Sequence, residues 1–373
     1  MAVRYITVTP VTKLFKPATR AFGDIAIVGG TDALATGPKK KPIPITNPES
    51  VSDASNPGGK DKPVDDLTWF KGDLGASVRT AMQQSPGPTT VWAVRTDSAD
   101  ANPLAAALAE VAKLDVQIVV LANQPLTAAA GQTEITALAG HVSSVSNTGG
   151  DGKERIGVAM LGKDVTNAGL VTGAMSIDRM VMVAHKSDGD AAAAAAGTIA
   201  GYEPHISVLL KPVVLSMDQL FSDSEIDGFN TAHVNWLTDP ALIPGRGLFM
   251  GEAYTLGTDA PYIDIVRTVD DVSFRLKAML IRSIGDLRIT RSGLRTLASQ
   301  MVAVLEPLQQ REVIDGYDVF MPLQVLLDKD PADLSAAELQ QIQNAQNART
   351  VDAVVSVDYA GAIHRLNITL KFV

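Results

Sequence analysis

The sequence contains no cysteine, few aromatic residues and no long apolar run. Without cysteine, a disulfide scaffold, a thiolate zinc site and a cysteine nucleophile are excluded. The alanine-rich run Ala191–Ala196 is far shorter than the roughly 18 apolar residues of a membrane span. Residues Met1–Val8 carry Arg4 and an alternating pattern instead of the apolar centre of a signal peptide. We therefore expect a soluble, unanchored protein made in the cytoplasm, with no direct membrane insertion.

The chain also lacks an excess of basic residues. Its 32 lysines and arginines stand against 41 aspartates and glutamates, so the formal net charge is -9. A protein that coats nucleic acid usually needs a basic surface, so we expect no nucleic-acid partner. What is present is an ordinary globular composition, with 46% hydrophobic and 20% charged residues over 373 positions. This length and composition predict two domains, or one large domain with additions.

Motifs for phosphate binding and nucleophilic catalysis are incomplete. Gly29-Gly30 and Gly37-Pro38-Lys39 follow a predicted strand, but their spacing differs from that of a phosphate-binding loop, and no Lys-Ser/Thr pair follows. The Gly-x-Ser-x-Gly turn of serine hydrolases is missing. We therefore predict no catalytic residue and no cofactor-binding residue.

The histidines are few and are not spaced as metal ligands. None has a second histidine at zinc-ligand spacing. His185, with Asp188 and Asp190 nearby, leaves open a metal or acid–base role, but histidines hydrogen-bonded at strand ends explain the pattern more simply. We predict no metal site. The five histidines are His141, His185, His205, His233 and His364.

The first two thirds of the chain alternate between strand and helix patterns. A buried strand is predicted at 22–28, and the proline-rich segment 36–66 is predicted to be a long surface loop. From residue 67 onward, continuous β-branched runs alternate with alanine-rich or amphipathic segments. This alternation predicts an α/β domain with a mostly parallel, mixed sheet covered by helices. The expected strands are 90–95, 116–121, 155–161 and 179–184, and the expected helices are 67–82, 103–114, 133–145 and 188–202.

The last third has a different pattern, which predicts an α+β domain. A strand is expected at 251–256 and a helix at 270–284, with Asp270-Asp271 favouring its N-terminus. Thr290 is the expected N-cap of a second amphipathic helix, and Ser335 to Glu338 form a capping-box pattern that opens a third. The remaining predicted strands are 317–327, 353–359 and 364–373.

Both ends of the chain carry an alternating strand pattern. At the N-terminus one face of the strand is Val3, Tyr5 and Thr7; at the C-terminus the apolar face is Leu366, Ile368, Leu370 and Phe372. Terminal residues usually fray unless they are docked. These strands pair either within their own subunit or with neighbouring copies, to which they would donate a strand. Head-to-tail donation is heterologous and produces rings or helical filaments.

Several segments, taken in chain order, resemble one known family. Val266-Arg267-Thr268 before a long helix is similar to an Arg-Thr motif, and Asp286–Thr290 is similar to the start of a second C-terminal helix. The remaining matching segments are Gly197–Tyr202, Gly245–Leu256, Ile314–Val319 and the closing strand. In these segments the sequence resembles the contractile tail sheath proteins of contractile-tailed phages, R-type bacteriocins and contractile injection systems.

The resemblance implies a structural protein and not an enzyme. Sheath subunits form sixfold rings stacked helically around an inner tail tube protein, and they meet baseplate and tail terminator proteins at the ends. Terminal arms would add strands to neighbours, and the sheath would contract to drive the tube through a target cell envelope. No cofactor is implied. The alternatives are a non-contractile self-assembling tube or capsid-associated protein, and an α/β enzyme with an unrecognised site.

The family pattern also suggests a division of the chain. It implies an N-terminal strand arm and linker (1–20), an outer α/β domain (21–245), an inner, tube-proximal domain (246–362) and a C-terminal strand arm (363–373). Between Val272 and Arg295 there are six basic residues and one acidic residue, Asp286. This basic stretch either faces the tube or is a solvated or inter-sheath surface. The candidate tube-facing residues are Arg275, Arg282, Arg291 and Arg295.

Overall fold

The computed structural model describes residues 21–32, 35, 37–47, 70–147, 152–243 and 247–364. These residues form two compact units. The large unit is Ala21–Asp271 together with the segment that starts at Gly361, and the small unit is Val272–Ala360. The expected division into outer and inner domains at residue 246 remains a prediction. Contacts within one chain define compact units, whereas outer and inner are positions in an assembly.

The large unit is built on a nine-stranded mixed sheet with the order β2-β3-β1-β4-β5-β6-β8-β9-β7. Neighbours from β3 to β8 are parallel, whereas β2, β9 and β7 run antiparallel to their neighbours. The mostly parallel mixed sheet predicted from the sequence is confirmed. The strands are β1 (Asp24–Gly29), β2 (Ile43–Ile45), β3 (Thr90–Arg95), β4 (Ile118–Leu126), β5 (Ile156–Leu161), β6 (Met180–Ala184), β7 (Pro212–Val213), β8 (Asn235–Thr238) and β9 (Leu248–Met250).

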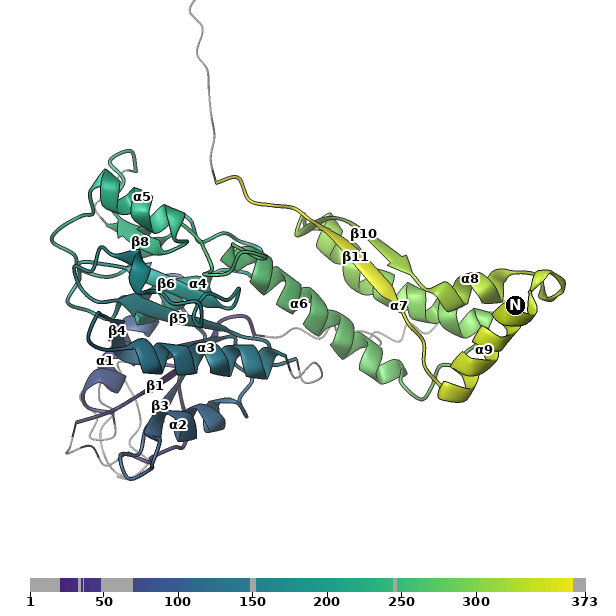
Figure 1. Ribbon diagram of the computed structural model, residues 1–373, viewed down its shortest axis with the longest axis horizontal. Helices are drawn as coiled ribbons and strands as arrows, with labels where there is room; N and C mark the ends of the chain where they lie inside the picture. The colour runs from purple at the N-terminus through teal and green to yellow at the C-terminus, as the bar shows by residue number, and fades with distance from the viewer. Residues whose placement is uncertain are drawn as a thin grey trace, which may run out of the picture. The chain divides into compact units, whose positions relative to one another are not determined.

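Helices cover both faces of this sheet (Figure 1). Alternate residues of β1 separate the two cores: Ile25 and Ile27 belong to one, Ala26 and Val28 to the other. The first face packs against α1 (Asp73–Met82) and α4 (Ala191–Gly201). The second packs against α2 (Pro103–Val111), α3 (Gln132–Ser146) and α5 (Asp223–Thr231). Because both faces are covered, the central strands read as continuous apolar runs.

Helix α4 is enclosed by the large unit on all sides. Residues Ala191–Ala196 are each at most 1% exposed. The carboxylate of Asp190 caps the helix, accepting from the backbone N–H of Ala193 at 2.9 Å and from the hydroxyl of Ser77 at 2.6 Å. Burial raises the pKa of Asp190. Small side chains let α1 cross close to α4, so the alanine run is a packing feature.

The small unit combines helices with a two-stranded antiparallel sheet. Helix α6 (Ile263–Leu280) starts in the large unit and ends in the small one. It is followed by α7 (Arg291–Gln310), β10 (Ile314–Phe320), α8 (Pro322–Asp328), α9 (Ala336–Ala348) and β11 (Val354–Tyr359). The Thr290 cap on α7 and the Ser335–Glu338 capping box on α9 are both confirmed. The α+β character expected of the last third is present in this unit.

Some elements differ from the sequence-based prediction for identifiable reasons. Residues 251–256 do not form the expected strand, because the side chain of Asn235 takes both the N–H and the C=O of Tyr254. The strand expected at 317–327 ends at Phe320, since Pro322 opens α8. Residues 43–45 of the predicted loop pair with β3 as β2.

Other boundaries also shift, and several elements are not predicted from the sequence, among them the two-residue strand β7. The helix expected at 270–284 begins at Ile263, so Asp270 is not at its N-terminus but pairs with Arg179 at 2.7 and 2.8 Å. The helix expected at 67–82 begins at Asp73. Helix α5 and strand β8 were not predicted at all, because both are short and α5 is polar over most of its length.

Gly197 provides a direct test of the α1–α4 crossing. A Cβ at this position would lie 2.2 Å from the carbonyl oxygen of Ala81, whereas one at Gly140 on α3 would meet nothing within 4 Å. We expect Gly197→Ala to lower the free energy of unfolding by about 2 kcal/mol. Gly140→Ala should raise it by about 0.5–1 kcal/mol, because alanine favours the helix. Thermal or denaturant unfolding measures both changes in the free energy of unfolding. Equal changes for the two variants would contradict the close α1–α4 crossing.

Candidate assembly surfaces

Among the described residues, the two-stranded sheet of the small unit has no third strand on either edge. In the described residues β10 pairs only with β11, in a register that places Tyr317 opposite Val357. One face packs onto a small core through Ile314 and Val355. Phe320 and Val354, opposite one another, are 48% and 54% exposed. Unpaired edges of this kind template the addition of another strand.

The strand residues expected in the two terminal arms lie outside the described residues. This applies to Val3, Tyr5 and Thr7 at one end and to Leu366, Ile368, Leu370 and Phe372 at the other. Their pairing therefore stays a prediction. The sheet formed by β10 and β11 is nevertheless a surface of the required chemistry, because its two edges offer backbone donors and acceptors beside exposed apolar side chains.

The candidate tube-facing arginines fall into two groups. On α7, Arg291 donates from Nε to the carbonyl of Leu327 at 2.7 Å and from Nη2 to that of Lys329 at 2.9 Å. Arg295 pairs with Asp328 at 3.0 Å, and Arg291 lies 3.4 Å from the same carboxylate. These two residues therefore bind the C-terminal end of α8, where unsatisfied carbonyls favour a cation.

The other group, Arg275 and Arg282, lies on α6 and directly after it. Arg282, in the short 3-10 helix Ile281–Ser283, is exposed, and so is Arg288. Neither has an ion-pair partner among the described residues. Arg275, on α6, is half-buried. The sequence did not reveal this difference, because Asp328 is more than 30 positions from the arginines it binds.

The Arg-Thr motif has an internal role. Arg267 is 6% exposed and donates from Nη2 to the carbonyls of Tyr202 at 2.9 Å and Phe22 at 3.3 Å. Burial lowers its pKa to about 10, although the carboxylates of Asp264, Asp271 and Asp270 act in the opposite direction. The guanidinium thus ties α6 to the end of α4 and to the chain just before β1.

The His185 cluster is arranged for capping. Nε2 of His185 lies 3.0 Å from the carbonyl of Leu161, and Nδ1 accepts from the N–H of Ser187 at 3.2 Å. This pattern fixes the neutral tautomer, and burial lowers the pKa of the ring. Asp190 caps α4, while Asp188 pairs with Lys163. No group of three metal-ligating side chains occurs in the part of the chain that the structure describes.

The other histidines have separate surroundings. Burial lowers the pKa of His141 to about 4, and nearby Arg155 acts in the same direction. His205 lies 3.6 Å from the carboxylate of Glu203, and His233 stacks on Tyr254 with ring centroids 5.0 Å apart. His364 contacts Glu252 and Ser207.

Gly29 serves close packing in the sheet. A Cβ on Gly29 would lie 2.5 Å from the Cβ of Ala122 on the neighbouring strand β4, which explains the absence of a side chain. Lys39 pairs with Asp97 at 2.7 Å. Gly29 is thus accounted for by close strand packing.

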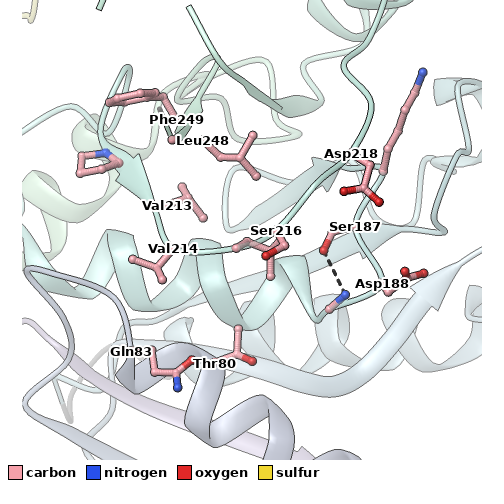
Figure 2. A pocket seen from close by; sticks show the side chains of 15 residues that line it. Thr80, Gln83, Ser187, Asp188, Val213, Val214, Ser216, Asp218, Leu248 and Phe249 are labelled. Atoms are coloured by element: carbon pink, nitrogen blue, oxygen red, sulfur yellow. Dashed lines mark hydrogen bonds between the residues drawn. The ribbon is translucent and has the colours of Figure 1, made fainter. Parts of the chain in front are cut away.

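A cleft of about 730 Å³ opens beside β7 and β9 (Figure 2). Its walls mix apolar residues such as Val213 and Leu248 with the polar side chains of Ser187, Asp188 and Asp218. The hydroxyl of Ser187 accepts from the N–H of Gly189 at 3.0 Å, so it acts as a turn constraint. Its lining residues include no histidine.

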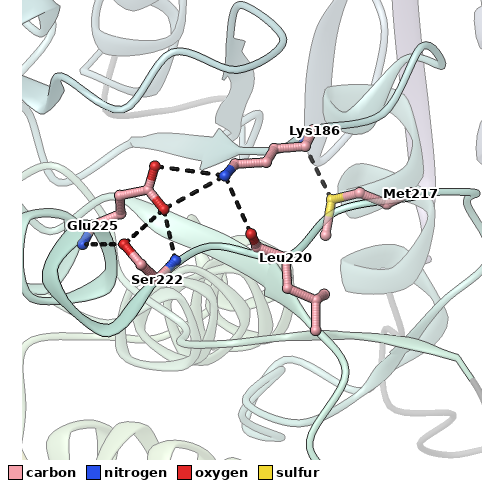
Figure 3. Close-up of polar contacts among 5 residues, drawn as sticks. All are labelled: Lys186, Met217, Leu220, Ser222 and Glu225. Atoms are coloured by element: carbon pink, nitrogen blue, oxygen red, sulfur yellow. Dashed lines mark hydrogen bonds and ion pairs between the residues drawn. The ribbon is translucent and has the colours of Figure 1, made fainter.

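Lys186 fastens the loop beside this cleft (Figure 3). Its Nζ donates to the carbonyl of Leu220 at 3.2 Å and lies 3.5 Å from Glu225, and its N–H points at the sulfur of Met217 at 3.1 Å. Glu225 also forms the capping box of α5 with Ser222, which lowers the pKa of Glu225. The side chains of Lys186, Ser222 and Glu225 thus each have a polar partner within this cluster. Among helices in the described part of the chain, none has the length and hydropathy of a membrane span.

No protein-family model matches the sequence, and no curated protein matches it. Solved structures do match over nearly the whole chain. A chain of the anti-feeding prophage (AFP) baseplate has a TM-score of 0.62 and 15% identity, covering 99% of both chains. The PVC sheath complex of an extracellular contractile injection system, in the contracted state, has a TM-score of 0.64 and 14% identity, covering 100% of this chain and 98% of the other.

A crystal structure of the sheath tail protein from Desulfitobacterium hafniense is similar too. Its TM-score is 0.56 at 12% identity, and the match covers 84% of this chain and 93% of that one. At such identities the likeness concerns the fold. The α/β unit, the helical small unit and their order along the chain are thus the fold found in sheath proteins of contractile systems.

Proposed function

We propose that this chain is the structural subunit of a contractile sheath, in a phage tail or a contractile injection particle. One combination of features supports the proposal. A chain with the sheath fold over nearly its whole length also has an open two-stranded sheet and an apolar, alternating strand sequence at each end. Such a subunit polymerises as helically stacked rings around an inner tube, between a baseplate and a terminator protein.

Connectivity in this assembly comes from strand addition. An arm of one subunit lies along an open edge of β10 or β11 in another, so backbone hydrogen bonds link the two chains. The exposed side chains of Phe320 and Val354 then become covered by the apolar face of the incoming strand. Because the donor and acceptor surfaces differ, the contact is heterologous and continues from copy to copy.

Contraction is then a change in how rigid bodies pack. The large unit suits this role, since its alanine-rich helix is enclosed and both sheet faces are covered. The terminal arms keep the subunits connected while the bodies reorient, which is a switch between two packings of one chain. The energy for such a switch is stored at assembly, so no nucleotide is required.

The C-terminal arm supplies the most direct test of this function. Deleting Leu366–Val373 should leave a folded subunit that no longer polymerises, because the removed strand completes a neighbour's sheet. Sedimentation and negative-stain microscopy measure assembly, and thermal unfolding measures folding. Wild-type protein should give striated cylinders that become shorter and wider after mild denaturant.

A matched pair of variants isolates the apolar face of this arm. Replacing Leu366, Ile368, Leu370 and Phe372 by serine should abolish cylinders, whereas serine at Asn367, Thr369 and Lys371 should leave them intact. Smooth tubes that never change length would favour a non-contractile assembly. Loss of thermal stability together with assembly would show that the strand pairs within its own subunit.

The basic stretch supplies a second test, on the tube partner. We infer that it binds an acidic stripe on the inner tube, with Arg275, Arg282 and the exposed Arg288 as contacts, while Arg291 and Arg295 also bind α8. The double variant Arg282→Glu/Arg288→Glu should yield empty or contracted sheaths beside naked tubes, with unchanged thermal unfolding. Co-expression of tube and sheath, followed by microscopy at two salt concentrations, measures this. Each exposed pair contributes little, so the effect depends on repetition.

Arg291→Ala serves as the comparison for folding, because it removes a contact within the small unit and not a contact with the tube. It should lower the stability of the small unit by about 1 kcal/mol, because two carbonyls of α8 lose their donor at a half-exposed site. Extended particles of wild-type salt sensitivity from the Arg282/Arg288 double variant would contradict the tube contact.

A further inference from the structure

The start of α6 brings together two points that are far apart in the sequence. One is Phe22, where the chain enters the large unit after the N-terminal arm; the other is His364, where it leaves toward the C-terminal arm. Arg267 on α6 binds the carbonyl of Phe22, and Tyr262, directly before α6, packs against the ring of His364. Five residues of helix correspond to about 7.5 Å, so both contacts lie within the first turns.

His364 occupies a socket with a partner for each ring nitrogen. Its Nδ1 lies 3.1 Å from the carboxylate of Glu252, and its Nε2 lies 2.9 Å from the hydroxyl of Ser207. A carboxylate only accepts, so Nδ1 carries a proton, and the hydroxyl of Ser207 can donate to Nε2. The side chains of His364 and Glu252 are only 11% and 7% exposed.

A row of aromatic rings packs against one side of His364. The ring of His364 meets Tyr262 edge-on at 4.7 Å, Tyr262 meets Tyr254 at 5.5 Å, and Tyr254 stacks on His233 at 5.0 Å. The strand-like pairing of Tyr254 with Tyr262 and the bond from the N–H of Ile263 to Ala253 fix this row to the start of α6. The socket is therefore part of the packed large unit and not of a loose terminus.

The buried contact of His364 follows an exposed segment that links the two units. Strand β11 ends at Tyr359 in the small unit, yet the segment from Gly361 belongs to the large unit. Residues Ala360 to Ile363 have no helix or strand, and Ile363 is 83% exposed. A contact as buried and as fully hydrogen-bonded as that of His364 therefore stands out from its flanking residues, as expected of an anchor.

We propose that the N-terminal end of α6 is a common anchor for both terminal arms, with Arg267 holding the chain at Phe22 and the Glu252–Ser207–Tyr262 socket holding it at His364. The role of the arms rests on the proposed function; the anchoring does not. Both strands offered to neighbours would start from one fixed place on the large unit. A fixed origin restricts the volume that each arm searches and so raises its effective concentration at the acceptor edge.

Trypsin digestion of the unassembled subunit tests the anchor directly, because a basic residue stands beside each root: Arg20 and Arg365. His364→Ala should raise the rate of cleavage after Arg365 about tenfold, since local opening no longer breaks two hydrogen bonds. Cleavage after Arg20 should not change. Arg267→Lys should speed cleavage after Arg20 and leave cleavage after Arg365 unchanged. His364→Gln keeps a donor toward Glu252, so cleavage after Arg365 should be slower in this variant than in His364→Ala.

Thermal unfolding separates this effect from general destabilisation, since His364→Ala should unfold as the wild type does. Sheath assembly of His364→Ala should require about tenfold more subunit, whereas removal of the arm abolishes it. Cleavage after Arg365 at the wild-type rate in His364→Ala would overturn the anchor even if cylinders form. Failure of wild-type protein to form cylinders would overturn the proposed function and leave the digestion result standing.

Discussion

The two-stranded sheet of the small unit is the feature on which the account depends. A pair of strands leaves as many backbone groups unpaired at its edges as it pairs in its centre, and an isolated pair is only marginally stable. Here β10 and β11 gain support from α7 on one face, while Phe320 and Val354 stay exposed. An edge of this kind can accept a further strand, and the sequence carries an alternating strand pattern at each end.

The large unit contributes rigidity and, in the proposed arrangement, the anchor for the arms. Enclosure of α4, the Asp190 cap and the Arg267 contacts leave few internal degrees of freedom. Residues that could suggest chemistry are used to build this body: His185 and Asp190 satisfy backbone groups, and Gly29 permits close strand packing. In the proposed function the subunit changes its neighbours and not its interior, and a body of this type suits that role.

Local signals in the sequence predicted much of the fold. The β-branched run before α3, the Thr290 cap and the Ser335–Glu338 box depend on neighbouring residues, so they could be recognised from sequence. Long-range interactions could not. The side chain of Asn235 prevents the strand expected at 251–256, and Asp328 engages Arg291 and Arg295 from a distant helix. The edge of β10 that could receive a strand depends on its pairing with β11, more than 30 positions away.

Disulfide trapping tests the central claim most directly, because the chain has no cysteine of its own. A cysteine at Ser356 of β11 or Asp318 of β10 would be combined in turn with one at Asn367, Thr369 or Lys371. Adjacent strands bring Cβ atoms within bonding reach of a disulfide. The account predicts that oxidised assemblies give a ladder of covalent multimers, and that mixing the two single variants gives dimers. Cross-linked monomers alone, or no cross-link in any register, would contradict strand exchange between subunits.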